Sequence, residues 1–87
     1  MRTSYNGYSN YETWVVNMWL NSNPYSQDML QHIIQAFETV SEQAEELEHN
    51  VMADGNYLGG ESSMWADLLH AAVGRVDWRE IIEVNAT

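Results

Sequence analysis

The chain has 87 residues, a net charge of −10 and no cysteine. A chain of this length forms one domain with a small core, so residues 1–87 are predicted to be a single domain. Without cysteine there are no disulfides and no thiolate metal sites. Apolar residues make up 45% of the chain, which is too many for a disordered acidic tail. The negative charge argues against direct binding to nucleic acid or to an anionic membrane and favours a basic partner.

The beginning of the chain lacks the basic and apolar regions of a signal peptide. No apolar run approaches the roughly 20 residues of a membrane span. We therefore expect a cytoplasmic protein without a membrane partner.

The first predicted helix covers residues 10–20. Ser9 and Glu12 have the spacing of a capping box, in which each side chain bonds a backbone amide near the other. Apolar residues follow at helical spacing and surround most of the helix, so we expect it to be largely buried. They are Tyr11, Trp14, Val15, Val16, Met18, Trp19 and Leu20.

A long second helix is predicted for residues 24–49. Asn23 is a good N-cap and Pro24 suits the first helical position. Alternating spacings of three and four define an a/d seam, which is expected to pack on the first helix or on a second copy of the chain. The seam residues are Leu30, Ile33, Phe37, Val40, Ala44 and Leu47.

Residues 50–61 are expected to form a loop, in which Asp54-Gly55 admits a small β-hairpin near residues 51–58. A third helix is predicted to start near Ser62 or Ser63 and to stop at Gly74. Its expected apolar face consists of Trp65, Leu68, Leu69, Ala72 and Val73.

Asp77 and Glu80 form a second capping box, with Val76 and Ile81 placed for a hydrophobic staple. A last short helix is therefore predicted over residues 78–84. The pattern as a whole indicates an all-α fold of about four helices around one aromatic-rich core.

An acidic block lies between residues 38 and 67, which contain no Lys or Arg and carry −8 of the net charge. Its glutamates at positions 38 to 48 span about 15 Å of predicted helix, roughly one charge per 3 Å, which is close to the spacing in one DNA strand. Such an array would pair with the Arg and Lys that normally hold phosphates. The alternative is a solvated face that keeps the protein soluble. The candidate partner-binding residues are Glu38, Glu42, Glu45, Glu46, Glu48, Asp54, Glu61 and Asp67.

The array is expected to reduce helix stability, because like charges four residues apart repel and acids near a helix C-terminus oppose its dipole. An exposed Tyr57, Trp65 or Trp78 beside the acids would anchor an arginine of the partner.

No residues indicate metal binding or catalysis. His32, His49 and His70 have no metal-ligand spacing, and the segment 54–56 matches only part of a calcium loop. There is no nucleophile elbow, P-loop or dinucleotide fingerprint. The sequence predicts no cofactor, no metal and no enzymatic activity.

Two segments carry a family resemblance. Tyr8-Ser9-Asn10-Tyr11-Glu12-Thr13-Trp14, followed by Asn17, Trp19 and Leu20, resembles a signature of small proteins from phages and mobile elements. The later segment 76–81 (VDWREI) fits the closing part of the same group. Members of this group resemble accessory domains and counter-defence proteins, including anti-CRISPR and antirestriction proteins, which are often short, acidic and DNA-like.

The resemblance and the acidic block together imply an anti-CRISPR protein in a bacterial host cell. It would be a DNA mimic that blocks PAM or target DNA binding by a Cas effector subunit, with type I Cascade as the first target. One alternative is an antirestriction DNA mimic. Another is a non-enzymatic structural or regulatory module that forms a homodimer through the seam of residues 30–47.

Overall fold

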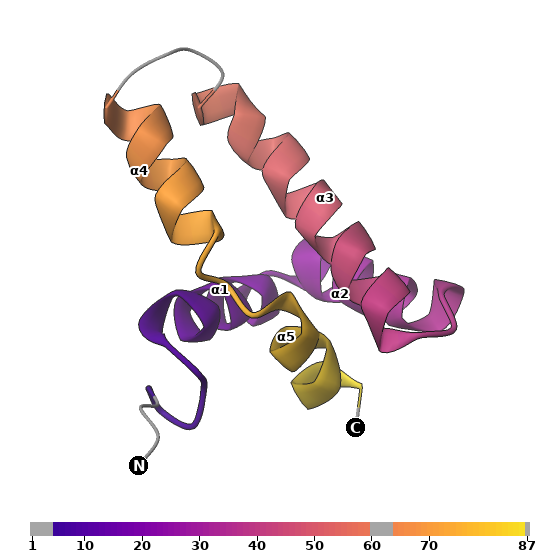
Figure 1. Cartoon of the computed structure of the whole chain (residues 1–87). Helices are drawn as coiled ribbons and strands as arrows, with labels where there is room; N and C mark the ends of the chain where they lie inside the picture. Colours follow the sequence, from indigo (N-terminus) through magenta and orange to yellow (C-terminus); the bar gives the residue numbers. More distant parts are fainter. Residues whose placement is uncertain (1–4, 60–63, 87) are drawn as a thin grey trace.

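The computed structural model describes the backbone of residues 5–59 and 64–86, and the side chains of residues 5–53 and 64–86. The described residues form five helices and no sheet: α1 (Tyr11–Ser22), α2 (Pro24–Ala36), α3 (Val40–Gly59), α4 (Met64–Val73) and α5 (Trp78–Asn85). The all-α prediction is therefore confirmed, with one helix more than expected. In Figure 1, α1, α2, α5 and the first half of α3 form a body, and the second half of α3 continues beside α4 as a two-helix arm.

The core lies where α2, α3 and α5 meet. Leu30, Leu47, Ile81 and Ile82 are fully buried there. Burial of each such side chain contributes about 1.5–3 kcal/mol. The short α5 therefore holds the body together, because it presents two isoleucines and the buried Trp78 to the longer helices.

The prediction of one long helix over residues 24–49 is wrong, because the chain turns at residues 37–39. Thr39 caps the new helix: its Oγ1 accepts from the Glu42 N–H at 3.1 Å, and Glu42 Oε1 accepts from the Thr39 N–H at 3.3 Å. The Gln43 side-chain amide donates to the carbonyls of Ile34 and Phe37, which α2 leaves unpaired at its end. These bonds stabilise the turn and fold α2 back against α3.

The turn places most of the predicted seam inside the chain itself. Leu30, Ile33, Ala44 and Leu47 are buried in the core, whereas Phe37, at the turn, is 36% exposed. Pairing of two copies through this seam would therefore require the core of each copy to open.

The predicted loop and hairpin are also wrong for the residues that the structure describes, because α3 continues as a helix to Gly59. Residues 60–61 of the predicted loop and the predicted helix start at Ser62 or Ser63 lie outside the described residues. Glycine inside a helix costs about 1 kcal/mol relative to alanine, which tertiary packing readily offsets. Val51 packs on the core and the backbone of α3 packs along α4, so Asp54-Gly55 does not end the helix.

The expected burial of α1 is wrong as well. Only Thr13 and Leu20 of this helix are buried, whereas Tyr11 is 52% and Trp19 67% exposed. The helix lies at the edge of the body and packs on α2 and α5 with one face. Its N-cap is Asn10 rather than Ser9, since the Asn10 side chain accepts from the Thr13 N–H at 2.9 Å.

The later helix ends agree better with the sequence. Asn23 and Asp77 cap α2 and α5 as predicted. Helix α4 stops before Gly74 as predicted, but its expected apolar face is only partly correct. Leu69 and Val73 are half-buried, whereas Trp65 is 72% and Leu68 53% exposed.

Candidate partner-binding surface

The structure brings only part of the acidic block together. Glu42, Glu45, Glu46 and Glu48, which we call the α3 glutamates, lie on the first half of α3. Glu38 lies in the turn that precedes this helix. The backbone of residue 54 lies further along α3, and Glu61 lies outside the described residues.

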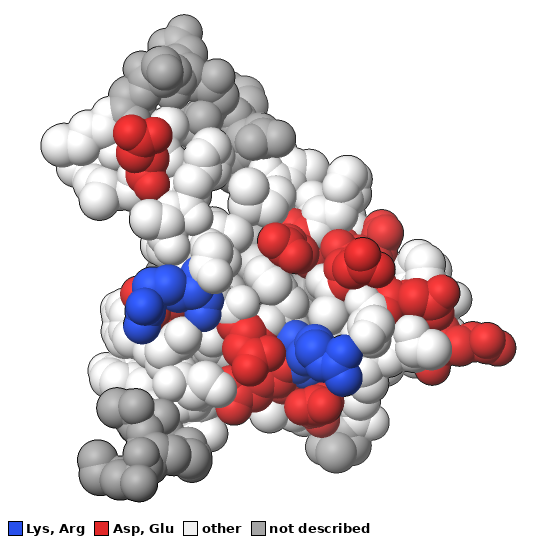
Figure 2. All heavy atoms as spheres, in the orientation of Figure 1, with Lys and Arg blue, Asp and Glu red and all other residues white. Residues whose placement is uncertain are grey.

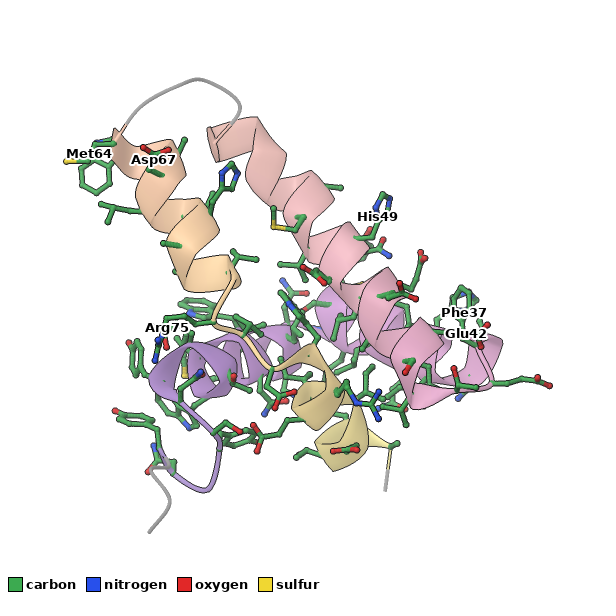
Figure 3. The ribbon with its side chains drawn as sticks, viewed as in Figure 1. Phe37, Glu42, His49, Met64, Asp67 and Arg75 are labelled. Atoms are coloured by element: carbon green, nitrogen blue, oxygen red, sulfur yellow. The ribbon has the colours of Figure 1, made fainter. Side chains whose placement is uncertain are left out.

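Asp67 is separate from the α3 glutamates. It lies on α4, in the arm, and Figure 3 shows it far from Glu42. Among the side chains that the structure describes, Asp67 therefore lies apart from the α3 glutamates and does not form one surface with them.

One side of α3 carries Glu42, Glu45, Glu46 and His49, which share a helix face by their spacing of three and four. With Phe37 they line an open depression of about 410 Å³. Figure 3 shows Phe37, Glu42 and His49 along this side of the helix. The histidine is the only residue of this face whose side chain can carry a positive charge.

The neighbouring side of α3 borders a second open groove, of about 720 Å³. Glu45 and Glu48 lie on one wall, and Arg75, Asp77 and Arg79 lie on the other. Figure 2 shows one group of acidic side chains beside the first half of α3 and others near the basic side chains and on the arm, while the basic side chains occupy two places. The groove therefore has mixed charge, and the depression beside it is acidic.

The α3 glutamates differ in their hydrogen bonds. Glu42 caps the helix through Thr39, and Glu46 Oε2 accepts from the Asn50 side-chain amide at 2.9 Å. Glu45 and Glu48 form no hydrogen bond or ion pair with the residues that the structure describes. Their carboxylates face solvent and are free to bind a basic group.

The position of the α3 glutamates also corrects the expected energetic cost. Because the chain turns before α3, these acids lie in the first half of a helix, and Glu42 lies in its first turn. A negative charge near a helix N-terminus is stabilised by the helix dipole. The array is therefore less costly than a C-terminal position would have made it, although like-charge repulsion within it remains.

Below this surface, the two segments with the family resemblance lie against each other. The Asn10 side-chain amide donates to the Arg75 carbonyl at 2.7 Å, and the Ser9 N–H donates to Glu80 Oε1 at 3.0 Å. Arg75 Nε also pairs with Glu12 at 3.3 Å. These contacts join the starts of α1 and α5, which sequence periodicity gave no reason to pair.

The aromatic residues near the N-terminus form a surface cluster. Tyr5 packs edge-on against Tyr11 and Trp14, with ring centroids 5.1 and 5.0 Å apart. Asn6 and Gly7 both have positive φ, as a tight hairpin turn requires. The turn brings the backbone of Tyr8 next to that of Tyr5, and the two residues form hydrogen bonds with each other. Tyr5 is 41% and Tyr11 52% exposed, so neither ring belongs to the aromatic-rich core that the sequence predicts. Of the proposed anchors, Trp78 is buried, Trp65 lies on α4 away from the α3 glutamates, and the Tyr57 side chain lies outside the described residues.

The described part of the chain contains no candidate metal site and no candidate membrane-spanning helix. No three His, Asp or Glu residues among those described group closely enough to hold a metal ion. No described helix has the length and apolar character needed to cross a membrane.

A family model matches residues 1–86, nearly the whole chain, and is described as the family of unknown function DUF7249. The chain belongs to the DUF7249 family. A search of curated proteins and a search of solved structures found no match for this DUF7249 protein.

Proposed function

We propose that this DUF7249 protein is a DNA-mimic inhibitor that occupies the basic DNA-binding surface of a defence effector in the bacterial cytoplasm. The observation that carries the proposal is the set of α3 glutamates: four acids on two helical turns, none in an ion pair with a described Lys or Arg. A carboxylate, like a phosphate, can accept two parallel hydrogen bonds from one arginine side chain.

The size of the array defines what it imitates. Glu42 and Glu48 are six residues apart, which is about 9 Å along a helix. This length matches a short run of DNA backbone and is too short to imitate a whole operator or target. The expected binding site on the effector is therefore a small cluster of Arg and Lys, such as one that reads a short motif in duplex DNA.

A Cas effector fits this description, because its protein part reads only a short PAM with basic side chains. The PAM-reading surface of a type I Cascade complex is the first target that we propose. A restriction enzyme is the alternative, since it would be inhibited through the same chemistry.

The test is competition for DNA. Purified Cascade, Cas9 and a restriction enzyme are each incubated with labelled target DNA and increasing amounts of the protein. For one of them we expect DNA release that weakens as salt rises, because salt screens the contacts between opposite charges. Simultaneous binding of DNA and protein to the effector would contradict the mimic.

Matched variants then test the site. Glu42→Gln, Glu45→Gln and Glu48→Gln in one protein remove three charges, while glutamine can still complete the helix cap at position 42. The control variant also removes three exposed charges, through Asp28→Asn, Asp67→Asn and Glu83→Gln. We expect the first variant to inhibit at least tenfold more weakly and the control to inhibit like the original. Equal effects of both variants would show that net charge acts rather than the α3 surface.

A further inference from the structure

Helix α4 carries an apolar face that no described residue covers. Met64 is 64%, Trp65 72% and Leu68 53% exposed, and Ala71 and Ala72 are exposed beyond them. These five residues follow the spacing of one helix face, which we call the α4 stripe.

The α4 stripe lies away from the face that α4 uses within the chain. Ala66 is buried at 4% exposure, and Leu69 and Val73 are half-buried; these three share the face that packs on α3. Large apolar side chains exposed together on a small protein are typical of an interaction surface.

We propose that the α4 stripe is the contact between two copies of this chain, which pair antiparallel about a two-fold axis at Leu68. The stripe has large side chains at one end and alanines at the other. An antiparallel pair places Met64 and Trp65 of each copy over Ala71 and Ala72 of the second copy. The surface is therefore complementary to itself, as a two-fold interface requires.

Charge favours a second copy over a basic partner at this place. Asp67 is the only charged Asp, Glu, Lys or Arg within α4, and by helical spacing it lies to one side of the stripe. The α3 glutamates lie on the far half of α3 from the end where Met64 begins α4 (Figure 3). Two copies joined at α4 thus keep their acidic surfaces apart, and a basic partner would find its complement on α3 instead.

The area predicts a weak dimer. With side chains of about 150–250 Å² each, the three large residues expose on the order of 400 Å² per copy. Two copies would bury about 800 Å² from these residues, which is below the usual 1,200 Å² of a stable complex unless the flanking arm contributes. The dimer is therefore expected to dissociate on dilution. The inference that the chain forms this dimer does not depend on the proposed function.

Sedimentation velocity across a wide range of protein concentration tests the proposal. The mass is expected to rise from the monomer value of 10.0 kDa towards twice that value. Trp65→Glu should raise the dissociation constant at least tenfold, because a tryptophan packed in an interface commonly contributes much of the binding energy. Trp19→Glu is the matched control: Trp19 is 67% exposed on α1, so the same change there should leave the dimer intact.

A second pair of variants tests the arrangement through the small residues. Ala72→Glu places a charge where Met64 or Trp65 of the second copy packs, and is expected to weaken the dimer as Trp65→Glu does. His70→Glu, on the other side of α4, should have no effect. Circular dichroism checks that each variant remains helical.

Cross-linking tests the two-fold axis directly. The chain has no cysteine, so Leu68→Cys introduces a single thiol that should form a disulfide between copies under mild oxidation. Trp19→Cys should not cross-link. The proposal is overturned if the protein stays monomeric at the highest concentration, or if Trp19→Glu and Trp65→Glu weaken the dimer equally.

Discussion

The backbone N–H of Asp77 donates a 2.8 Å hydrogen bond to Thr13 Oγ1, 64 positions earlier in the chain. The same hydroxyl donates to Asn10 Oδ1 at 2.7 Å, and Thr13 is fully buried. One hydroxyl thus connects the N-cap of α1 to the N-cap of α5. This bond fixes α5 at its start, and α5 in turn supplies Ile81 and Ile82 to the core.

Thr13→Val should therefore lower the stability of the protein markedly, although the two side chains have nearly the same shape. Valine leaves the Asp77 N–H without its acceptor and removes one of the two hydrogen bonds that Asn10 Oδ1 accepts. The expected cost is about 1–3 kcal/mol. Thr13→Ser keeps the hydroxyl and loses one methyl group, for which about 1 kcal/mol is expected. Urea unfolding measures both variants, and a serine variant less stable than the valine variant would contradict the role of the hydroxyl.

The pH dependence of stability should contain a contribution from Glu12. A hydrogen bond from its own backbone N–H, helped by the Arg75 guanidinium, lowers the pKa of this carboxyl below its ordinary value of 4.5. The unfolded chain therefore binds the proton more readily, so the stabilisation is full above pH 4.5 and is lost as pH falls through the folded-state pKa.

Glu12→Gln is the comparison that isolates this contribution. Unfolding free energies of both proteins are measured from neutral pH into the acid range. The difference between them should be constant above the ordinary pKa of glutamate and should shrink below it. A difference that grows as pH falls would contradict the lowered pKa.

Local signals in the sequence predicted several helix ends correctly. Asn23-Pro24 and Asp77 begin helices, and Gly74 follows the end of one, because caps depend on a few adjacent residues. The break at residues 37–39 also had such a signal, since Thr39 and Glu42 have the spacing of a capping box. The regular apolar seam that runs across the break concealed it. Spacing alone does not distinguish one long helix from two helices that pack on each other.

The burial of α1 and α4 depended on long-range packing and was not predictable from periodicity. Both helices are apolar on more than one face, and the neighbours decide which face is covered. The acidic surface was predicted in part: Glu42, Glu45, Glu46 and Glu48 share one short stretch of α3 because they are close in sequence. Asp67 lies apart from them, because its position relative to them depends on the connection between two helices.

The cap at the start of α3 should be a distinct element of stability. Thr39→Ala removes the hydroxyl that accepts from the Glu42 N–H, and about 1 kcal/mol of stability should be lost. Thr39→Ser retains the acceptor and should be close to the original protein. Thermal unfolding followed by circular dichroism compares the three proteins. If the Thr39→Ala and Thr39→Ser proteins are equally stable, the cap does not stabilise the turn between α2 and α3.

Salt should stabilise the fold while it weakens binding to a basic partner. The like-charge pairs 42/45, 42/46 and 45/48 are each unfavourable by about 0.2–0.5 kcal/mol, and salt screens them. Between low and high sodium chloride, stability is therefore expected to rise by on the order of 1 kcal/mol. The variant with Glu42→Gln, Glu45→Gln and Glu48→Gln should be more stable at low salt and should respond less to salt. If the stability of that variant rises with salt as much as that of the original protein, the repulsion lies outside the α3 glutamates. The salt dependence of the control variant with Asp28→Asn, Asp67→Asn and Glu83→Gln would then be measured for comparison.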